Sequence, residues 1–299
     1  MTLRVPRLTL RTRDKLSGYS FVAPQFAGFS VFVLGPIGAV VWFSLHDWNI
    51  VAGNFNRIWL DNYQAILDDA LIDTVALNSI AFTVGYVPLN VLSRLILALA
   101  VNRAMAGMWL FRTLYFTPVV VSLVAWTIVW RFMLAGDGVL NGLLRAVGVE
   151  GPNWLRDPTL AMLSVVLVQV LKNAGLSMIL FLAALQGIPA DLVDAARVDG
   201  AGRWQLFRHV TLPLITPFVF LVTVLAVISA LKSFSLIFLT TRGGPGDATL
   251  VLAYYIYEVA FHALEMGYAS ALAVVLFLVV LAFTTTQFVV RKRWVFYEE

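Results

Sequence analysis

The chain has 299 residues, of which 60% are apolar and only 13% are charged, with a mean hydropathy of +0.85. Soluble globular domains average about 25% charged residues, so this chain lacks the ions that a water-facing surface of its size needs. The shortage excludes a soluble enzyme, a disordered chain and a nucleic-acid-binding module, in spite of a net charge of +4. We therefore predict a polytopic membrane protein.

Six stretches are long and apolar enough to cross a membrane, which takes about 20 residues in a helix. They are 21–45, 77–101, 115–134, 160–182, 218–238 and 252–290. The last is too long for one span, and its polar opening places the membrane part at 269–290. We expect an all-α protein with a single membrane domain: a tail over 1–20, six helices over 21–290 and a tail over 291–299. The outer loops have room for short helices.

Basic residues are divided unevenly between the two sides of these stretches. One side has thirteen and the other has five, whereas acidic residues favour the second side. Because Lys and Arg favour cytoplasmic loops, both termini are predicted to be cytoplasmic. The thirteen are Arg4, Arg7, Arg11, Arg13, Lys15, Arg103, Arg112, Arg197, Arg203, Arg208, Arg291, Lys292 and Arg293; the five are Arg57, Arg131, Arg145, Arg156 and Arg242.

Motifs for catalysis are missing from the sequence. It has no GxxxxGK[ST] phosphate loop and no cysteine, and His46, His209 and His262 fall in separate loops. No carboxylate lies inside the six spans when the last is taken as 269–290, whereas proton-coupled carriers usually need a membrane-embedded acid or histidine. We therefore expect no catalytic site, no metal site and no cofactor in this chain, and we disfavour a proton symporter.

The loop over 187–217 differs from the others. Pro189 suits the first turn of a short amphipathic helix, and Gly200 and Gly202 then break that helix. An ordinary amphipathic loop resting on lipid headgroups is the alternative that composition leaves open. A second short helix is predicted from Trp204, Phe207 and Val210, and the return to the membrane from Pro213 and Pro217.

Within this loop, Asp194-Ala195-Ala196-Arg197-Val198-Asp199-Gly200-Ala201, followed by Phe207 and Thr211-Leu212-Pro213, resembles the EAA signature of ABC-importer permeases. The stretches 111–118, 181–189, 239–245 and 293–295 are similar to carbohydrate-uptake permeases of the maltose and glycerol-phosphate type. The resemblance thus runs along nearly the whole chain. Asp194 stands where the signature usually has Glu, and Gly202 where Ser is common.

The resemblance implies a type I ABC importer permease in a bacterial plasma membrane, which is not itself an enzyme. Its implied partners are a second, homologous permease, two copies of an ATP-binding subunit that binds ATP and Mg, an extracytoplasmic solute-binding protein and membrane lipid, with no nucleic acid. The implied substrate is a sugar, carried by alternating access. The implied coupling residues are Asp194, Ala195, Ala196, Asp199, Gly200, Arg203 and Phe207.

Polar side chains within the stretches are candidates for the substrate pathway, since such groups usually face a cavity or a partner. Other roles remain open: Arg94 can snorkel to the interface, and Lys172 and Asn173 can tie helices together. Three cations without an acid (Arg94, Lys172 and Lys232) allow an anionic sugar. The candidates are Asn90, Arg94, Gln169, Lys172, Asn173, Ser229, Lys232 and Ser233, with Phe234 beside them.

Two other classes of function compete with the importer permease. A stand-alone secondary carrier is disfavoured by the missing membrane acid and by the loop over 187–217. A membrane receptor or scaffold would need neither Gly200 nor polar groups within the membrane. ATP dependence of uptake separates the first two classes, and uptake itself separates the third.

Overall fold

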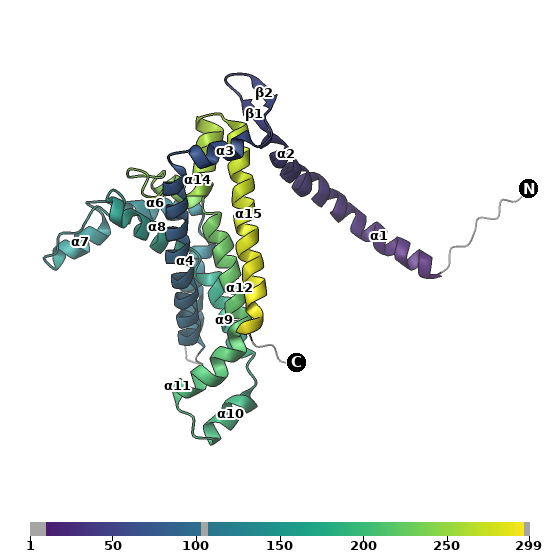
Figure 1. Ribbon diagram of the computed structural model, residues 1–299. Helices are drawn as coiled ribbons and strands as arrows, with labels where there is room; N and C mark the ends of the chain where they lie inside the picture. The colour runs from purple at the N-terminus through teal and green to yellow at the C-terminus, as the bar shows by residue number, and fades with distance from the viewer. Residues whose placement is uncertain (1–9, 103–106, 296–299) are drawn as a thin grey trace, which may run out of the picture.

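The computed structural model describes residues 10–102 and 107–295, so Arg4, Arg7 and Arg103 of the charge count lie outside the described residues. The described chain is almost entirely helical (Figure 1). Its α-helices are α1 (Leu10–Phe29), α2 (Gly35–Phe43), α3 (Asp61–Asp68), α4 (Ile72–Val101), α5 (Met108–Val120), α6 (Leu123–Met133), α7 (Val139–Ala146), α8 (Pro158–Lys172), α9 (Ala174–Gln186), α10 (Ala190–Val198), α11 (Arg203–Leu206), α12 (Leu212–Leu231), α13 (Ser235–Thr240), α14 (Leu252–Tyr257) and α15 (Met266–Val290).

Helix α4 runs through the centre of the bundle and packs against α8, α9 and α12. Near one end, Phe82 and Tyr86 join a buried cluster with Val165. Near the other end, Leu95 joins a second cluster with Phe181 of α9 and Ile215 of α12, among others. Burying such side chains between helices is what holds the broken segments of α8 and α9 in one place.

The sequence predicted one continuous helix for each of the third and fourth spans. In the structure each of these spans consists of two helices. Helices α5 and α6 meet at 108°, and α8 and α9 meet at 54°. Pro118 in the last turn of α5 precedes the first break, and the Ser122 hydroxyl accepts a hydrogen bond from the Ala125 amide to start α6. With each bent pair taken as one, the described residues contain up to six spans by length and composition.

The second short helix predicted after Gly202 is not separate. A single helical stretch runs from Arg203 to Leu231, with a π-helical turn over Phe207–Thr211 inside it. Such a turn widens the helix just before Pro213, whose ring would otherwise meet a carbonyl of the preceding turn. The prediction that the fifth span continues to residue 238 is also wrong, because α12 ends at Leu231 and three non-helical residues separate it from α13.

An antiparallel hairpin, β1 (His46–Asn49) and β2 (Asn54–Arg57), caps one end of the bundle, so the fold is not purely helical. Strand β1 lies against α15, where Gly267 has no side chain to separate the two backbones. Asn62 of α3 donates hydrogen bonds to the carbonyls of Ser44 and His46. The hairpin therefore joins the beginning and the end of the described chain.

The first apolar helix begins earlier than predicted, because α1 starts at Leu10 within the expected tail. Charged residues with good helix propensity allow it to continue outward. Within the apolar stretch Ser17–Phe43, α1 projects away from the bundle (Figure 1) and α2 contacts α15, and none of the most apolar window is buried. Phe21 and Phe32 are 85% and 81% exposed, so lipid or another subunit has to cover this arm.

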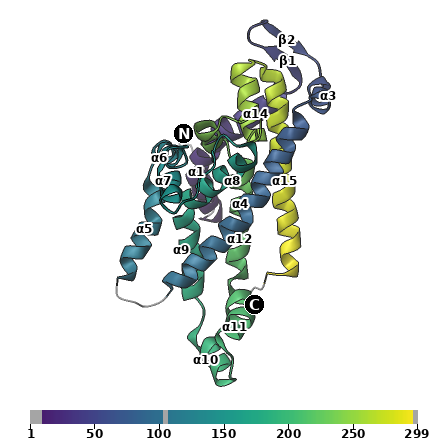
Figure 2. The same ribbon diagram turned by 90° about the vertical axis from the view of Figure 1, so that its left-hand side faces the viewer.

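The loops separate into two groups at opposite ends of the bundle. Figure 2 shows the end of α4, the start of α5 and helices α10 and α11 at one end. The hairpin, α3 and α14 lie at the other end. The loops that the sequence assigns to one side of a membrane are thus on one side of the molecule.

Candidate functional site

A cavity of about 450 Å³ lies between α6, α8, α12 and α13. It forms where two helices end, since α8 ends at Lys172 and α12 ends at Leu231. The cavity brings together residues that are more than 50 positions apart in the sequence. Six of the eight predicted pathway residues line it: Gln169, Lys172, Asn173, Ser229, Lys232 and Ser233.

Arg94 does not line this cavity and does not snorkel to the interface. Its side chain is completely buried, and its guanidinium donates hydrogen bonds to the carbonyl oxygens of Val170 (2.6 Å), Asn90 (2.9 Å) and Asn173 (3.3 Å). The Val170 and Asn173 carbonyls lie at the break between α8 and α9. Arg94 therefore ties α4 to the carbonyls that this break leaves without an intrahelical partner.

Lys172 does the same for the other broken span. Its ammonium group donates to the carbonyl oxygens of Pro118 (2.5 Å), Val121 (2.8 Å) and Val119 (3.4 Å), around the end of α5. Asn173, the next residue, donates to the Tyr86 hydroxyl of α4 at 3.1 Å. One short segment thus connects both helix breaks to α4.

Asn90 is buried beside Arg94, and its side-chain oxygen has no hydrogen-bond partner among the described residues. Its backbone carbonyl accepts from Arg94. Neither Asn90 nor Arg94 lines the cavity, so these two of the predicted pathway residues are separated from the other six.

An aromatic cluster lies next to the cavity. Phe234 lines it, and its ring centroid is 5.5 Å from that of Phe238 on α13 and 5.0 Å from that of Tyr257 on α14. Tyr254 stacks at 6.2 Å from Phe234. Of these rings the sequence reasoning named only Phe234. The i, i+4 spacing of the two phenylalanines and the i, i+3 spacing of the two tyrosines were the signal for one aromatic face.

The predicted coupling residues lie on α10, on α11, on the turn between them and, for Phe207, at the start of the π-helical turn after α11; these elements are at the opposite end from the hairpin (Figure 1). Gly200 has a φ of +83°, and the amides of Gly200 and Ala201 donate to the carbonyls of Arg197 (3.0 Å) and Ala196 (2.9 Å). This is a Schellman motif, which favours glycine at its left-handed position. The predicted break at Gly200 is confirmed. The remaining coupling residues are Asp194, Ala195, Asp199, Arg203 and Phe207, and Asp194 pairs with Arg197 at 3.0 Å.

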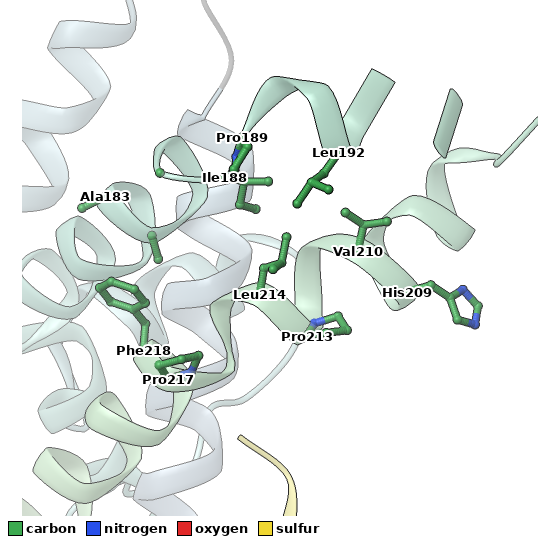
Figure 3. A pocket seen from close by; sticks show the side chains of 12 residues that line it. Ala183, Ile188, Pro189, Leu192, His209, Val210, Pro213, Leu214, Pro217 and Phe218 are labelled. Carbon is green, nitrogen blue, oxygen red and sulfur yellow. The ribbon is translucent and has the colours of Figure 1, made fainter. Parts of the chain in front are cut away.

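A cavity of about 700 Å³ lies behind α10 (Figure 3). Apolar side chains from the end of α9, from α10 and from the start of α12 line it. Leu192 and Val210 point toward one another across it, whereas the His209 ring points away. The loop also exposes Val198 (87%) and Trp204 (68%), although each is apolar. An exposed apolar surface on a projecting loop is typical of a docking surface.

Asp69 joins three elements at the hairpin end. One of its carboxylate oxygens accepts hydrogen bonds from the hydroxyls of Tyr255 (2.5 Å) and Tyr268 (2.7 Å), and the other accepts from the Leu71 amide. Burial alone would raise the pKa of Asp69, but these hydrogen bonds together hold it below its ordinary value of 3.8. The ionised carboxylate therefore stabilises the packing of α14 and α15 beside α4.

Within residues 10–102 and 107–295, no group of three or more His, Cys, Asp or Glu side chains is placed to hold a metal ion. The site thus consists of a polar cavity with an aromatic wall, two cation-stabilised helix breaks and a projecting loop. Such a site can bind a polar solute and contact a partner.

The family match described next includes the residues of the polar cavity and of the loop over 187–217. Residues 95–295 match the model of the family described as binding-protein-dependent transport system inner membrane component. The chain is 33% identical over 296 residues to the lactose transport system permease protein LacF of Rhizobium radiobacter, covering 94% of this chain and 96% of LacF. It is 32% identical over 278 residues to the sulfoquinovosyl glycerol transport system permease protein SmoG of Agrobacterium fabrum, covering 92% and 90%.

A solved structure shares the fold. A chain of a bacterial alginate ABC transporter, in complex with an alginate pentasaccharide-bound periplasmic protein, superposes with a TM-score of 0.83 at 22% identity, covering 94% of this chain and 96% of that chain. The bent spans and the loop over 187–217 therefore belong to a type I ABC importer permease fold. With its several apolar helices, this chain is a multi-pass inner-membrane protein and belongs to the family of binding-protein-dependent transport system inner membrane components.

Proposed function

We propose that this chain is one of two permease subunits of an ATP-driven importer for a sugar or a sugar derivative. A polar, aromatic-walled cavity and a projecting loop within one family-matched region carry the proposal. Hydroxyl, amide and ammonium groups suit the hydroxyls of a sugar, and Phe234 suits its apolar face. LacF and SmoG carry names of sugar-type substrates, which supports the same class.

The mechanism we propose is alternating access. A solute-binding protein delivers the sugar at the hairpin end, and two copies of a separate ATP-binding subunit, which hold ATP and Mg, dock on the loop around α10. Both termini are then cytoplasmic. ATP favours one arrangement of the ATP-binding subunits, and their closure moves α10 and rocks the helices. This chain contributes no catalytic residue.

The coupling step is tested with the Gly200→Asp variant. The added Cβ meets nothing within 4 Å inside the chain, so the variant is expected to insert with its helices in place, and the strain of a non-glycine residue at a φ of +83° is confined to this turn. It places a charge on the docking surface, and we expect ATP-driven uptake and co-purification of the ATP-binding subunit to be lost. Normal uptake by a normally assembled complex would contradict the assignment. Uptake without ATP would favour the stand-alone carrier instead.

A further inference from the structure

Two of the three cations in the apolar region are held by hydrogen bonds to the chain itself. Arg94 is completely buried and donates to three backbone carbonyls and to the Ser93 hydroxyl. Lys172 has three ammonium protons and three carbonyl oxygens around it. Both side chains stabilise helix breaks, which explains why charged groups occur there without a carboxylate.

Lys232 is different. It follows the last residue of α12 and lines the cavity, and its ammonium group has no acceptor among the described residues. Neither ion pair of the described chain involves it, and no Asp or Glu lines the cavity.

The neighbours of Lys232 also have free polar groups. Gln169, Ser229 and Ser233 line the same cavity, and no described residue forms a hydrogen bond with the side chain of any of them. Asn173, by contrast, is bound to Tyr86. With Ser235, which also lines it, the cavity thus holds one cation, one amide and three hydroxyls that are all available to a solute, next to the ring of Phe234.

We propose that Lys232 is the residue that makes this cavity selective for a sugar bearing an anionic group. The anion is held by the Lys232 ammonium and by Gln169, Ser229 and Ser233, while Arg94 and Lys172 keep the cavity open without touching the solute. This inference rests on the proposed transport function. It adds the charge of the substrate and the residue that recognises this charge. A neutral sugar would leave the Lys232 ammonium without a counter-charge in this cavity, because no Asp or Glu lines it.

The chain has no cysteine, so a single introduced thiol can report on the cavity. We would place Ser229→Cys in the full-length chain in membrane vesicles and compare its modification by sulfonatoethyl and trimethylammonioethyl methanethiosulfonate, which are anionic and cationic. The expected anionic-to-cationic rate ratio falls about tenfold when Lys232→Met is added and is retained with Lys232→Arg. Val51→Cys on the exposed hairpin serves as the control, with no change in its ratio.

A second measurement uses a neutral thiol reagent with glucuronate or glucose present. We expect glucuronate to protect the Ser229→Cys thiol more strongly than glucose, and Lys232→Met to remove the difference. An unchanged rate ratio in Lys232→Met, equal protection by both sugars or protection by neither overturns the proposal. Absence of ATP-driven uptake by the unsubstituted chain with its partner subunits, with these labelling results intact, would instead count against the proposed transport function, so the two failures are distinguishable.

Discussion

The Lys172 ammonium donates a hydrogen bond to the carbonyl oxygen of Pro118 at 2.5 Å, so the last residue of α8 caps the end of α5. One broken span thereby stabilises the other. The two residues are 54 positions apart in the sequence, and the local sequence pattern of neither helix predicts this contact.

Replacing Lys172 by Met removes the donor for three carbonyls at the α5–α6 break. Buried carbonyls without a partner are costly, so we expect the free energy of unfolding to fall by about 1–3 kcal/mol. The measurement is thermal or detergent-induced unfolding of the purified protein. Lys172→Arg keeps a cation with several donors and is expected to lose less. Equal stability of the Met variant and the wild type would show that the carbonyls have other partners.

Val198→Glu tests the docking surface without touching the core. Val198 is 87% exposed, so we expect the stability of this chain to change by less than about 0.5 kcal/mol. The new charge replaces an apolar contact, and co-purification of the ATP-binding subunit should fall at least about tenfold. The matched control is Val51→Glu, at a 76% exposed valine of the hairpin, which should leave co-purification unchanged. Equal effects of the two variants on co-purification would contradict the proposal that this loop contacts the ATP-binding subunit.

The stability that Asp69 contributes depends on pH in a definite direction. Because its pKa is lower in the folded protein than its ordinary value of 3.8, the contribution is present above about pH 4 and disappears as the pH falls through the lowered value. Asp69→Asn should therefore be less stable than the wild type at neutral pH, and the gap should narrow in acid. Melting temperatures measured from about pH 7 to about pH 3 give the comparison. A gap that widens in acid would contradict the hydrogen-bonded carboxylate.

Gly267→Ala tests the contact between the hairpin and α15. The added Cβ would overlap the carbonyl oxygen of His46 and lie 2.9 Å from the Trp48 amide nitrogen, both backbone atoms. We expect a loss of more than about 2 kcal/mol in the free energy of unfolding. Gly85→Ala in α4 is the control, because its Cβ would meet only Val166 at 3.6 Å. Comparable melting temperatures for the two variants would mean that the hairpin moves freely.

Single cysteines at Val51 and Val198 test the proposed orientation. We expect a membrane-impermeant maleimide to label Val51→Cys in intact cells from outside the inner membrane, and Val198→Cys only after the membrane is opened. Both side chains are highly exposed, so labelling reports sidedness and not burial. The reverse pattern would place both termini outside.

The sequence predicted the apolar stretches, the Gly200 turn and, with Phe234, six polar residues that line the cavity, because these depend on local composition and spacing. It did not predict the breaks near Pro118 and Asn173, since apolar residues continue on both sides of each break. The hydrogen-bond partners of Arg94 and Lys172 are equally absent from local patterns. Most of these partners lie on segments that are distant in the sequence. Only the three-dimensional arrangement of the helices shows that Arg94 and Lys172 are hydrogen-bonded to carbonyls and that Lys232 is not.

The contact of Gly267 with β1 has a consequence for biogenesis. The hairpin is synthesised long before α15, yet its strand β1 and the Asn49–Glu265 bridge need the last helix as their support. The contacts of β1 with α15 can therefore form only after the chain has been synthesised beyond residue 265. A chain stopped before that residue would have the hairpin without the helix on which β1 packs.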